Sequence, residues 1–241
     1  MIVTTRAISL QSVKYGETSL VAKLYTEQLG TVSYMINGIR SSKGIAKAAL
    51  FQPCSLLEIQ AYHRENKNLQ RLKDYRRGAL YTSIPFNMQK SAIAQIIIET
   101  LHRCVRQAES NPPLFDWIWN TFLTLDRTTY THPEFHLLVM MKITSFIGIE
   151  PHGYFSEHTP LFDLKEGSFV PKSRQTEFSI PYPNSMYLSL LKTEDLNLNK
   201  PLMPNHDVRN EILQILLHFF RLHIPEFGNI KSVEVLQSLF R

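Results

Sequence analysis

The sequence predicts an α+β protein in which a small β domain precedes a mainly α-helical domain. Three observations indicate this order. Apolar and polar residues alternate through much of residues 1–80, apolar residues recur every three or four positions through much of 81–241, and short alternating runs interrupt the helical pattern near 150–184. Alternation is typical of half-buried strands, and the longer spacing is typical of amphipathic helices. We therefore expect two domains, 1–80 and 81–241, with a small β-hairpin region in the second.

Five strands are expected in the first domain. The alternating runs cover residues 7–15, 19–25, 31–37, 56–62 and 69–76, and Gly-containing turns separate the first three. Residues 45–51 are rich in Ala and Lys and predict a short helix, which Pro53 ends. Five short strands with a helix between the third and the fourth are typical of the oligonucleotide/oligosaccharide-binding (OB) fold, a partly open barrel.

Helices are expected through most of the second domain. Helical spacing of apolar residues covers 88–108, 114–125, 134–147, 208–222 and 232–240. The pair Pro112-Pro113 separates the first two helices, and Pro133 precedes the third. Between the third and fourth helices, the patterns at 161–163 and 168–170 predict the small hairpin.

Positive charge is concentrated in the first domain. The chain has 241 residues and a formal net charge of +5. Residues 1–80 contain 12 Lys/Arg and 5 Asp/Glu, whereas residues 81–241 contain 14 and 16. A basic module beside a nearly neutral remainder indicates attraction to a polyanion, usually through its phosphates. A solvated basic surface without a partner is the alternative, and charge alone leaves it open.

Composition limits the class of protein. With 44% hydrophobic and 20% charged residues, the chain can bury a sizeable core. The first residues lack the features of a signal peptide, and no run approaches the ~20 apolar residues that span a bilayer. Cys54 and Cys104 are the only cysteines, which argues against a disulfide framework and predicts a reducing, cytoplasmic compartment.

Several segments together resemble the N-terminal domain of the RecO family. They read YGETSLV at 15–21, YTEQLGTV at 25–32, NGIR at 37–40 and LFQP at 50–53, and HIPEFG at 223–228 is similar to a later part of the family. The resemblance implies an OB barrel, a helical domain and a nucleoid-associated role in bacterial DNA repair. It implies binding of single- and double-stranded DNA, annealing of complementary strands, and loading of recombinase onto DNA covered by single-stranded DNA-binding protein. The implied partners are RecR and the C-terminal tail of that binding protein.

One departure from the family concerns zinc. Many members carry a four-cysteine zinc module after the third long helix, and residues 148–172 contain no cysteine. His152, Glu157, His158 and Asp163 are possible ligands, but their spacing matches no closed zinc pattern. We therefore expect no metal and no other cofactor.

The segment 38–44 is the first candidate for DNA binding. Gly38 and Gly44 flank Arg40 and Lys43, and Lys47 follows, so this loop is expected to offer mobile cations to a phosphate backbone. Further cations of the first domain extend the basic surface: Arg6, Lys23, Arg71, Lys73, Arg76 and Arg77. Solvated positions without a partner are the alternative, above all for Arg76 and Arg77 at the domain junction and for Lys23 on the outer face. Nothing resembles a helix that reads the major groove, so no sequence preference is expected.

Tyrosines on the predicted strands are candidates for stacking on bases. Tyr34 is one, and Tyr25 and Tyr62 are two more. The alternative for all three is a place in the barrel core or a cross-strand contact, which is the commoner role of strand aromatics.

The helical domain is the candidate for partner binding. The resemblance implies capture of an acidic, apolar tail, which requires an apolar groove with cations at its edge. Arg103, Arg106, Arg127 and Lys142 lie on predicted helices beside apolar residues, with ordinary surface ion pairs as the alternative.

The sequence favours binding without chemistry. No GxxxxGK[ST] loop and no nucleophile motif occurs, so a protein that is not an enzyme is expected. Two other hypotheses remain: an adaptor whose basic β domain contacts an acidic protein, and a nuclease, against which the missing carboxylate metal cluster argues.

Overall fold

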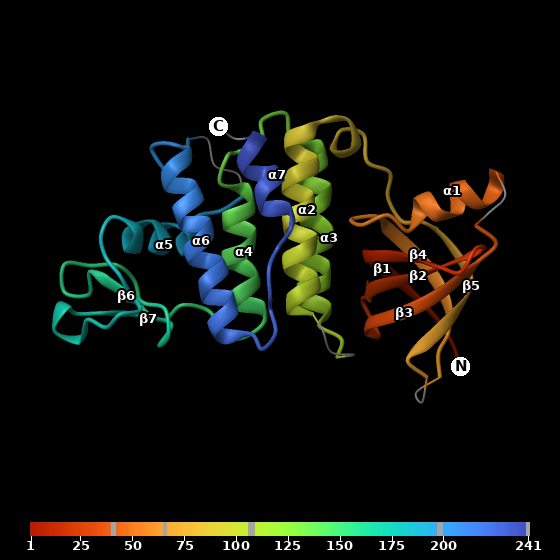
Figure 1. Cartoon of the computed structure of the whole chain (residues 1–241), viewed down its shortest axis with the longest axis horizontal. Coiled ribbons are helices and arrows are strands. Elements are labelled where there is room, and N and C mark those ends of the chain that lie inside the picture. Colours follow the sequence, from red (N-terminus) through yellow and green to blue (C-terminus); the bar gives the residue numbers. More distant parts are fainter. Residues whose placement is uncertain (40–41, 65–66, 106–108, 197–199, 240–241) are drawn as a thin grey trace. The chain divides into compact units, whose positions relative to one another are not determined.

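The computed structural model describes residues 1–39, 42–64, 67–105, 109–196 and 200–239, without the side chains of residues 42, 43 and 45 (Figure 1). The chain divides into two compact units, Met1–Thr128 and Thr129–Arg241. The predicted boundary at residue 80 falls inside the first unit, between the barrel and the two long helices that follow it. As a functional boundary it stays a prediction. None of the described helices is long and apolar enough to span a membrane.

Five strands form a closed barrel in the first unit. They are β1 (Ile2–Tyr15), β2 (Ser19–Thr26), β3 (Gly30–Asn37), β4 (Leu56–Tyr62) and β5 (Leu69–Arg77). Their order is β1-β2-β3-β5-β4, and β3 pairs with β5 in parallel while the other pairs are antiparallel (Figure 1). The predicted OB-fold barrel is confirmed. Strand β1 begins five residues before its expected start, because Val3 and Thr5 turn inward although the polar run Thr4-Thr5-Arg6 hides the alternation.

Helix α1 (Ser42–Leu50) lies between β3 and β4 and begins earlier than predicted. Phe51, directly after it, is fully buried in the barrel core and packs edge-on against Tyr75 of β5 with 5.0 Å between ring centroids. The expected flexible loop at 38–44 is therefore wrong at its C-terminal end. Gly44 lies within α1, and a Cβ there would overlap the backbone of Gly38 and Ile39, so this glycine permits close chain packing.

Arg6 of β1 joins the barrel to α3 (Pro112–Arg127). Its Nε donates to Glu27 Oε2 at 2.9 Å, its Nη2 donates to Glu27 Oε1 at 2.8 Å, and Nη2 also pairs with Asp116 of α3. The guanidinium carbon lies 5.3 Å and 5.4 Å from the ring centroids of Phe115 and Trp119. The hydrogen bonds to Glu27 are the main reason why the pKa of Arg6 rises above its usual value. Two carboxylates and two rings thus occupy this side chain.

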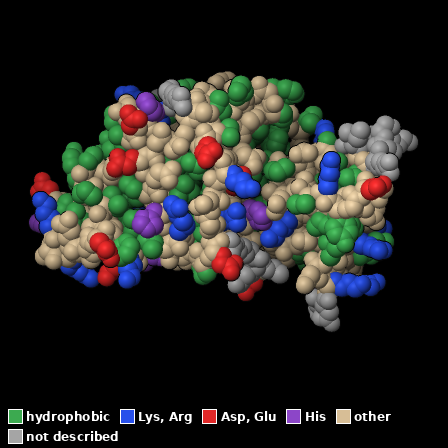
Figure 2. Space-filling view, in the orientation of Figure 1, with side chains coloured by type: hydrophobic (Ala, Val, Ile, Leu, Met, Phe, Trp, Pro, Cys, Tyr) green, Lys and Arg blue, Asp and Glu red, His purple; other side chains and the backbone are tan. Residues whose placement is uncertain are grey.

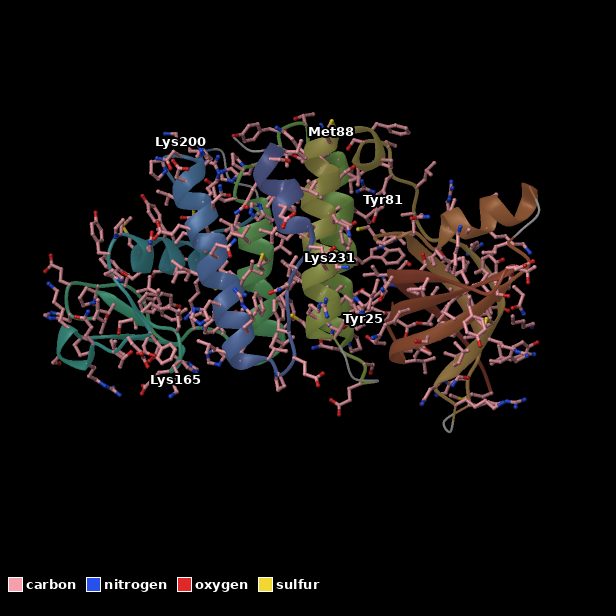
Figure 3. The ribbon with its side chains drawn as sticks, in the orientation of Figure 1. Tyr25, Tyr81, Met88, Lys165, Lys200 and Lys231 are labelled. Atoms are coloured by element: carbon pink, nitrogen blue, oxygen red, sulfur yellow. The ribbon has the colours of Figure 1, made fainter. Side chains whose placement is uncertain are left out.

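Tyr25 of β2 makes a second contact between the barrel and α3. Its hydroxyl donates to the carbonyl oxygen of Asn111 at 3.1 Å, and its ring centroid lies 5.6 Å from that of Phe115. Figure 3 shows Tyr25 at the edge of the barrel beside this helix. The barrel and α3 therefore share a continuous apolar and hydrogen-bonded contact.

A charged clamp holds the segment that leaves the barrel for α2 (Met88–Cys104). The Asp126 carboxylate accepts hydrogen bonds from the backbone N–H groups of Thr82, Ser83 and Ile84 at 2.8–2.9 Å. Burial alone raises the pKa of Asp126, but these hydrogen bonds outweigh it and lower that pKa to about 2. Lys90, only 4% exposed, donates to the carbonyl oxygen of Asp126 at 3.0 Å. Helices α2 and α3 are thereby tied together where this segment passes.

The second unit contains four helices and one small sheet among its described residues. These are α4 (Phe135–Phe146), α5 (Asn184–Thr193), α6 (His206–His223), α7 (Ser232–Leu239), and the strands β6 (Leu161–Asp163), β7 (Ser168–Val170) and β8 (Ser179–Ile180), ordered β7-β6-β8. Short 3₁₀ turns occur at Lys172–Arg174 here and at Ile84–Phe86 in the first unit. The predicted helical domain with a small β-hairpin is confirmed. Strand β8 and helix α5 were not predicted, because Pro181 and Pro183 mask the pattern around them.

Aromatic packing and one carboxylate hold the cysteine-free sheet together. The ring of Phe162 lies 4.9 Å from that of Phe169 and 5.8 Å from that of Phe219 on α6. Asp163 accepts hydrogen bonds from the N–H groups of Lys165 and Glu166 at 3.0 Å and 2.9 Å. In the described parts of the chain, no three His, Cys, Asp or Glu side chains are grouped so that they could hold a metal ion.

A buried ion pair lies just before α4. His132 Nδ1 lies 2.8 Å from Oε2 of Glu134, and Nε2 lies 2.7 Å from the carbonyl oxygen of Lys200. The Glu134 N–H, at 3.3 Å from Nδ1, is the weaker contact. Burial alone lowers the pKa of His132, but the hydrogen bonds to Glu134 and Lys200 outweigh it and raise that pKa above its ordinary 6.5. The geometry therefore favours the doubly protonated ring.

Replacing Arg6 tests the contact between the barrel and α3. We expect Arg6→Gln to lower the free energy of unfolding by about 1–2 kcal/mol, because charged hydrogen bonds are lost at a partly exposed site. Urea unfolding measures this change. Lys14→Gln, at an exposed position on β1, is the matched control and should change stability by less than about 0.5 kcal/mol. Equal effects of both variants would contradict the assigned role.

The His132–Glu134 pair predicts a pH-dependent contribution to stability. Because the pKa of His132 is raised on folding, its stabilisation is complete below pH 6.5 and is lost as the pH rises through the folded-state value. We expect the difference in unfolding free energy between the native chain and His132→Asn to shrink between pH 6 and pH 9. The two chains must be compared because burial also lowers the pKa of His136, to about 3. His136 therefore makes both chains less stable as the pH falls, and subtracting one unfolding free energy from the other removes this contribution. His158→Asn, at an exposed position, should show no such trend.

Candidate nucleic-acid interface

Outward-facing residues of β2, β3 and β5 form one side of the barrel. Lys23 of β2 is opposite Ser33 of β3, which is opposite Leu69 of β5. One step along the same face, Met35 is opposite Arg71. Alternate residues of these strands fill the core, so this face is the outer surface of the barrel. In OB folds the strand 2–3 face and the loops at the barrel rim are the usual oligonucleotide surface.

The connection between β4 and β5 adds cations beside that face. Gln70, only 4% exposed, donates Nε2 to the carbonyl oxygens of Arg64 and Lys67 at 2.7 Å and 2.6 Å. The Arg64 N–H donates back to Gln70 Oε1 at 3.2 Å. These three hydrogen bonds fix the backbone on both sides of the turn. The side chains of Arg64 and Lys67 thus extend from a braced segment.

A cavity of about 380 Å³ opens at this connection. Its lining residues are Tyr62, Arg64, Lys67, Leu69, Gln70 and Arg71. Three of these are cations, and no carboxylate is among the described residues that line the cavity. We define the basic face as Lys23, Arg64, Lys67, Arg71 and Lys73. Figure 2 shows Lys and Arg side chains over the barrel.

Strand β5 supplies the densest charge of the basic face. Arg71 and Lys73 are both exposed. The ladder with β4 shifts register between Gln60 and Ala61, so Lys73 is an extra, unpaired residue at a β-bulge. A bulge bends its strand, and here it places Lys73 outside the regular ladder. The structure thus brings Lys23 and Arg71 to one side of the barrel, and Lys73 is exposed two residues further along β5.

Three other predicted cations lie elsewhere. The guanidinium of Arg6 is occupied by Glu27, Asp116 and two rings, so we leave Arg6 out of the proposed interface. Arg76 pairs with Glu58 across the β4–β5 ladder, on a surface that also contains Asp74. Arg77 lines a different groove. The partners of Arg6 are residues 27 and 116, which are distant in sequence, so the sequence around Arg6 could not reveal that its guanidinium is paired.

The expectation that Tyr34 stacks on bases is corrected by its position. Its ring is 0% exposed in the barrel core, and burial raises the pKa of its hydroxyl well above 10. Tyr25 is also buried, against α3. Tyr62 is different, because it is 47% exposed at the end of β4. Of the three tyrosines considered, only Tyr62 offers a ring to a ligand.

The cations first expected to bind DNA are only partly described. Arg40 lies outside the described residues. Lys43 has a described backbone in the first turn of α1, and nothing is described of its side chain. Lys47 is half-buried in the last turn of α1. Their role in DNA binding stays a prediction.

Two of the cations expected to bind a partner, Arg103 and Arg127, lie apart in the first unit. Arg103 is in the last turn of α2 and Arg127 ends α3, and the contact of Lys90 with the end of α3 shows that these helices are antiparallel. Arg103 and Arg127 therefore lie at opposite ends of the helix pair. Lys142 is exposed on α4 in the other unit, and Arg106 lies outside the described residues.

A more apolar groove of about 310 Å³ lies where β5 leads towards α2. Its lining includes Leu50, Leu56, Leu80 and Ala94, with Arg77 as its cation. Leu80 is 68% exposed, and further along the chain Phe86 and Met88 are 85% and 71% exposed, although Ile84 is buried. Several large exposed apolar side chains on one short segment indicate a candidate interaction surface.

Sequence reasoning missed Arg64 and Lys67. The signal was present, because HRENKN at 63–68 is a polar, basic turn between two predicted strands. Rim loops of OB barrels are the places where such cations can reach a ligand. What the sequence did not reveal is that the buried amide of Gln70 hydrogen-bonds to the backbone of Arg64 and Lys67.

The buried hydroxyl of Tyr34 gives a test of the corrected assignment. It has no hydrogen-bond partner among the described residues. We expect Tyr34→Phe to leave the free energy of unfolding unchanged or to raise it by up to about 1 kcal/mol, because an unsatisfied polar group is removed. Tyr34→Phe should also leave the affinity for single-stranded DNA unchanged, measured on the same protein samples. A loss of DNA affinity at unchanged stability would restore Tyr34 to the interface.

Comparison with known proteins covers nearly the whole chain. The family model described as "Recombination protein O N terminal" matches residues 1–77, and "Recombination protein O C terminal" matches residues 85–232. Proteins named DNA repair protein RecO from Bacteroides fragilis and Christiangramia forsetii are each 33% identical to this chain, and that from Flavobacterium johnsoniae is 32% identical. Each alignment covers 100% of both chains.

Proposed function

Because this chain belongs to the RecO family of DNA repair proteins, we propose that it is a recombination mediator whose barrel binds single- and double-stranded DNA through the phosphate backbone. The observation that carries the proposal is the basic face, in which cations of β2, β5 and the β4–β5 connection share one side of the barrel. Phosphate contacts hold a strand without reading its sequence. The interface is therefore not sequence-specific.

Annealing of complementary strands follows from the same charge. Two polyanions approach each other more readily on a cationic surface, because each phosphate contact releases bound counterions and lowers the repulsion between strands. The protein helps to load recombinase onto DNA covered by single-stranded DNA-binding protein, with RecR as a second partner. Its action is binding without turnover, so it is not an enzyme.

The apolar groove beside Arg77 is our candidate site for the C-terminal tail of single-stranded DNA-binding protein. That tail is acidic and ends in an apolar residue, which requires an apolar groove with a cation at its edge. Leu50, Leu56 and Leu80 supply the apolar lining and Arg77 supplies the cation. The helix cations expected from the sequence stay a second candidate for this tail.

Removing two cations of β5 tests DNA binding by the basic face. We expect Arg71→Gln/Lys73→Gln to weaken binding of a single strand of ~30 nucleotides by roughly 10- to 30-fold at 0.1 M salt. The slope of log affinity against log salt should become shallower by about 1.4, since two phosphate contacts of a single strand are lost. Fluorescence anisotropy across a salt series measures both quantities.

The matched control removes two exposed lysines from the second unit. Lys200→Gln/Lys231→Gln changes the net charge equally and should leave the salt slope unchanged. Equal losses in both variants would mean that only net charge matters, and the basic face would lose its assignment. If the native chain does not bind DNA at all, the adaptor hypothesis replaces the mediator. Magnesium-dependent shortening of the strand would instead indicate a nuclease.

A further inference from the structure

The cavity at the β4–β5 connection combines an aromatic wall with cations. Tyr62 is the last residue of β4 and is directly opposite Arg71 of β5. Directly opposite residues in an antiparallel pair have Cβ atoms about 4.5–5.5 Å apart on the same face. Tyr62 is 47% exposed and Leu69, also in the lining, is 39% exposed. An apolar surface thus adjoins a guanidinium within one small cavity.

The size and rigidity of the cavity suit one nucleotide. A volume of about 380 Å³ is at the lower end of the ~300–1,000 Å³ range of small-molecule sites. Gln70 makes two donated hydrogen bonds and one accepted to the backbone of Arg64 and Lys67, so these two cations start from a fixed backbone. A braced site loses less conformational entropy on binding than a loose basic tail does.

We propose that this cavity is a subsite for a single unpaired nucleotide of a DNA strand, whose base stacks on Tyr62 while Arg64, Lys67 and Arg71 bind its flanking phosphates. The proposal rests on the proposed DNA binding. It names Tyr62 as the residue that makes the barrel bind single-stranded DNA in preference to double-stranded DNA. Stacking needs an exposed base face, and in a duplex both faces are already covered by neighbouring bases. Both kinds of DNA offer phosphates, so phosphate contacts alone do not require an unpaired base.

The subsite is expected to tolerate any base. Every base has a π-face, so stacking carries no sequence information. Gln70, the neutral polar side chain in the lining, is 4% exposed and is committed to the backbone of the turn. The cavity thus selects for an unpaired base rather than for its identity.

The test compares two tyrosines of the same barrel. We expect Tyr62→Leu to weaken single-strand binding by about 5- to 150-fold and to change double-strand binding by less than about twofold, because one stacked base is lost. Tyr62→Phe should restore single-strand binding, since the ring is kept. Tyr15 is the last residue of β1, whereas Tyr62 is opposite Ile2 at the start of that strand. Tyr15 is 61% exposed, so Tyr15→Leu is the control and should have no effect on DNA binding. Circular dichroism and thermal unfolding establish that each variant folds.

A second measurement locates the contact directly. A single strand carrying 5-iodouracil, irradiated in complex with the intact protein, should crosslink to the peptide that contains Tyr62. Equal weakening of single- and double-strand binding by Tyr62→Leu, or crosslinks to other peptides only, would overturn the subsite. Steeply salt-dependent binding that Tyr62→Leu leaves intact would reject the subsite and retain the basic face. Absence of DNA binding by the native chain would reject both.

Discussion

The side chain of Arg6 is the interaction on which the arrangement of the first unit depends. It contacts Glu27 at the end of the β2–β3 hairpin, Asp116 of α3, and the rings of Phe115 and Trp119. A strand residue, a hairpin and a helix distant in sequence are thereby fixed to one another. Glu27 and Asp116 both bind this guanidinium, so two carboxylates of the first unit are directed at Arg6 at the contact with α3.

This contact explains how the cations of the barrel are divided. Arg6 and Arg76 are bound by carboxylates, whereas Arg64, Lys67 and Arg71 line a cavity without one among the described residues. Both groups lie within the basic first 80 residues, so the sequence alone cannot separate them. Tertiary pairing separates them, since the partners of Arg6 are 21 and 110 residues away. Attraction to a polyanion is consequently expected to be strongest at this cavity, where the described lining residues include no carboxylate.

Periodicity predicted the architecture and the core, and it failed where the backbone is irregular. Alternation identified β2, β3 and β4, and it should also have placed Tyr34 inside, because Val32 and Ile36 share its face. The bulge at Lys73, the close approach at Gly44 and the brace by Gln70 depend on contacts between separate segments. The same holds for α5 and β8, which lie among prolines and are held by neighbours. The features of the interface that could not be predicted from the sequence thus depend on contacts between residues that are distant along the chain.

We propose that the basic face of the barrel holds the DNA backbone. Hydrogen–deuterium exchange of the intact protein, with and without a saturating single strand, tests it most directly, because bound backbone and braced turns exchange more slowly. We expect added protection in peptides covering residues 60–73 and none in residues 161–180 of the second unit. Protection confined to the second unit, with residues 60–73 unchanged, would contradict it.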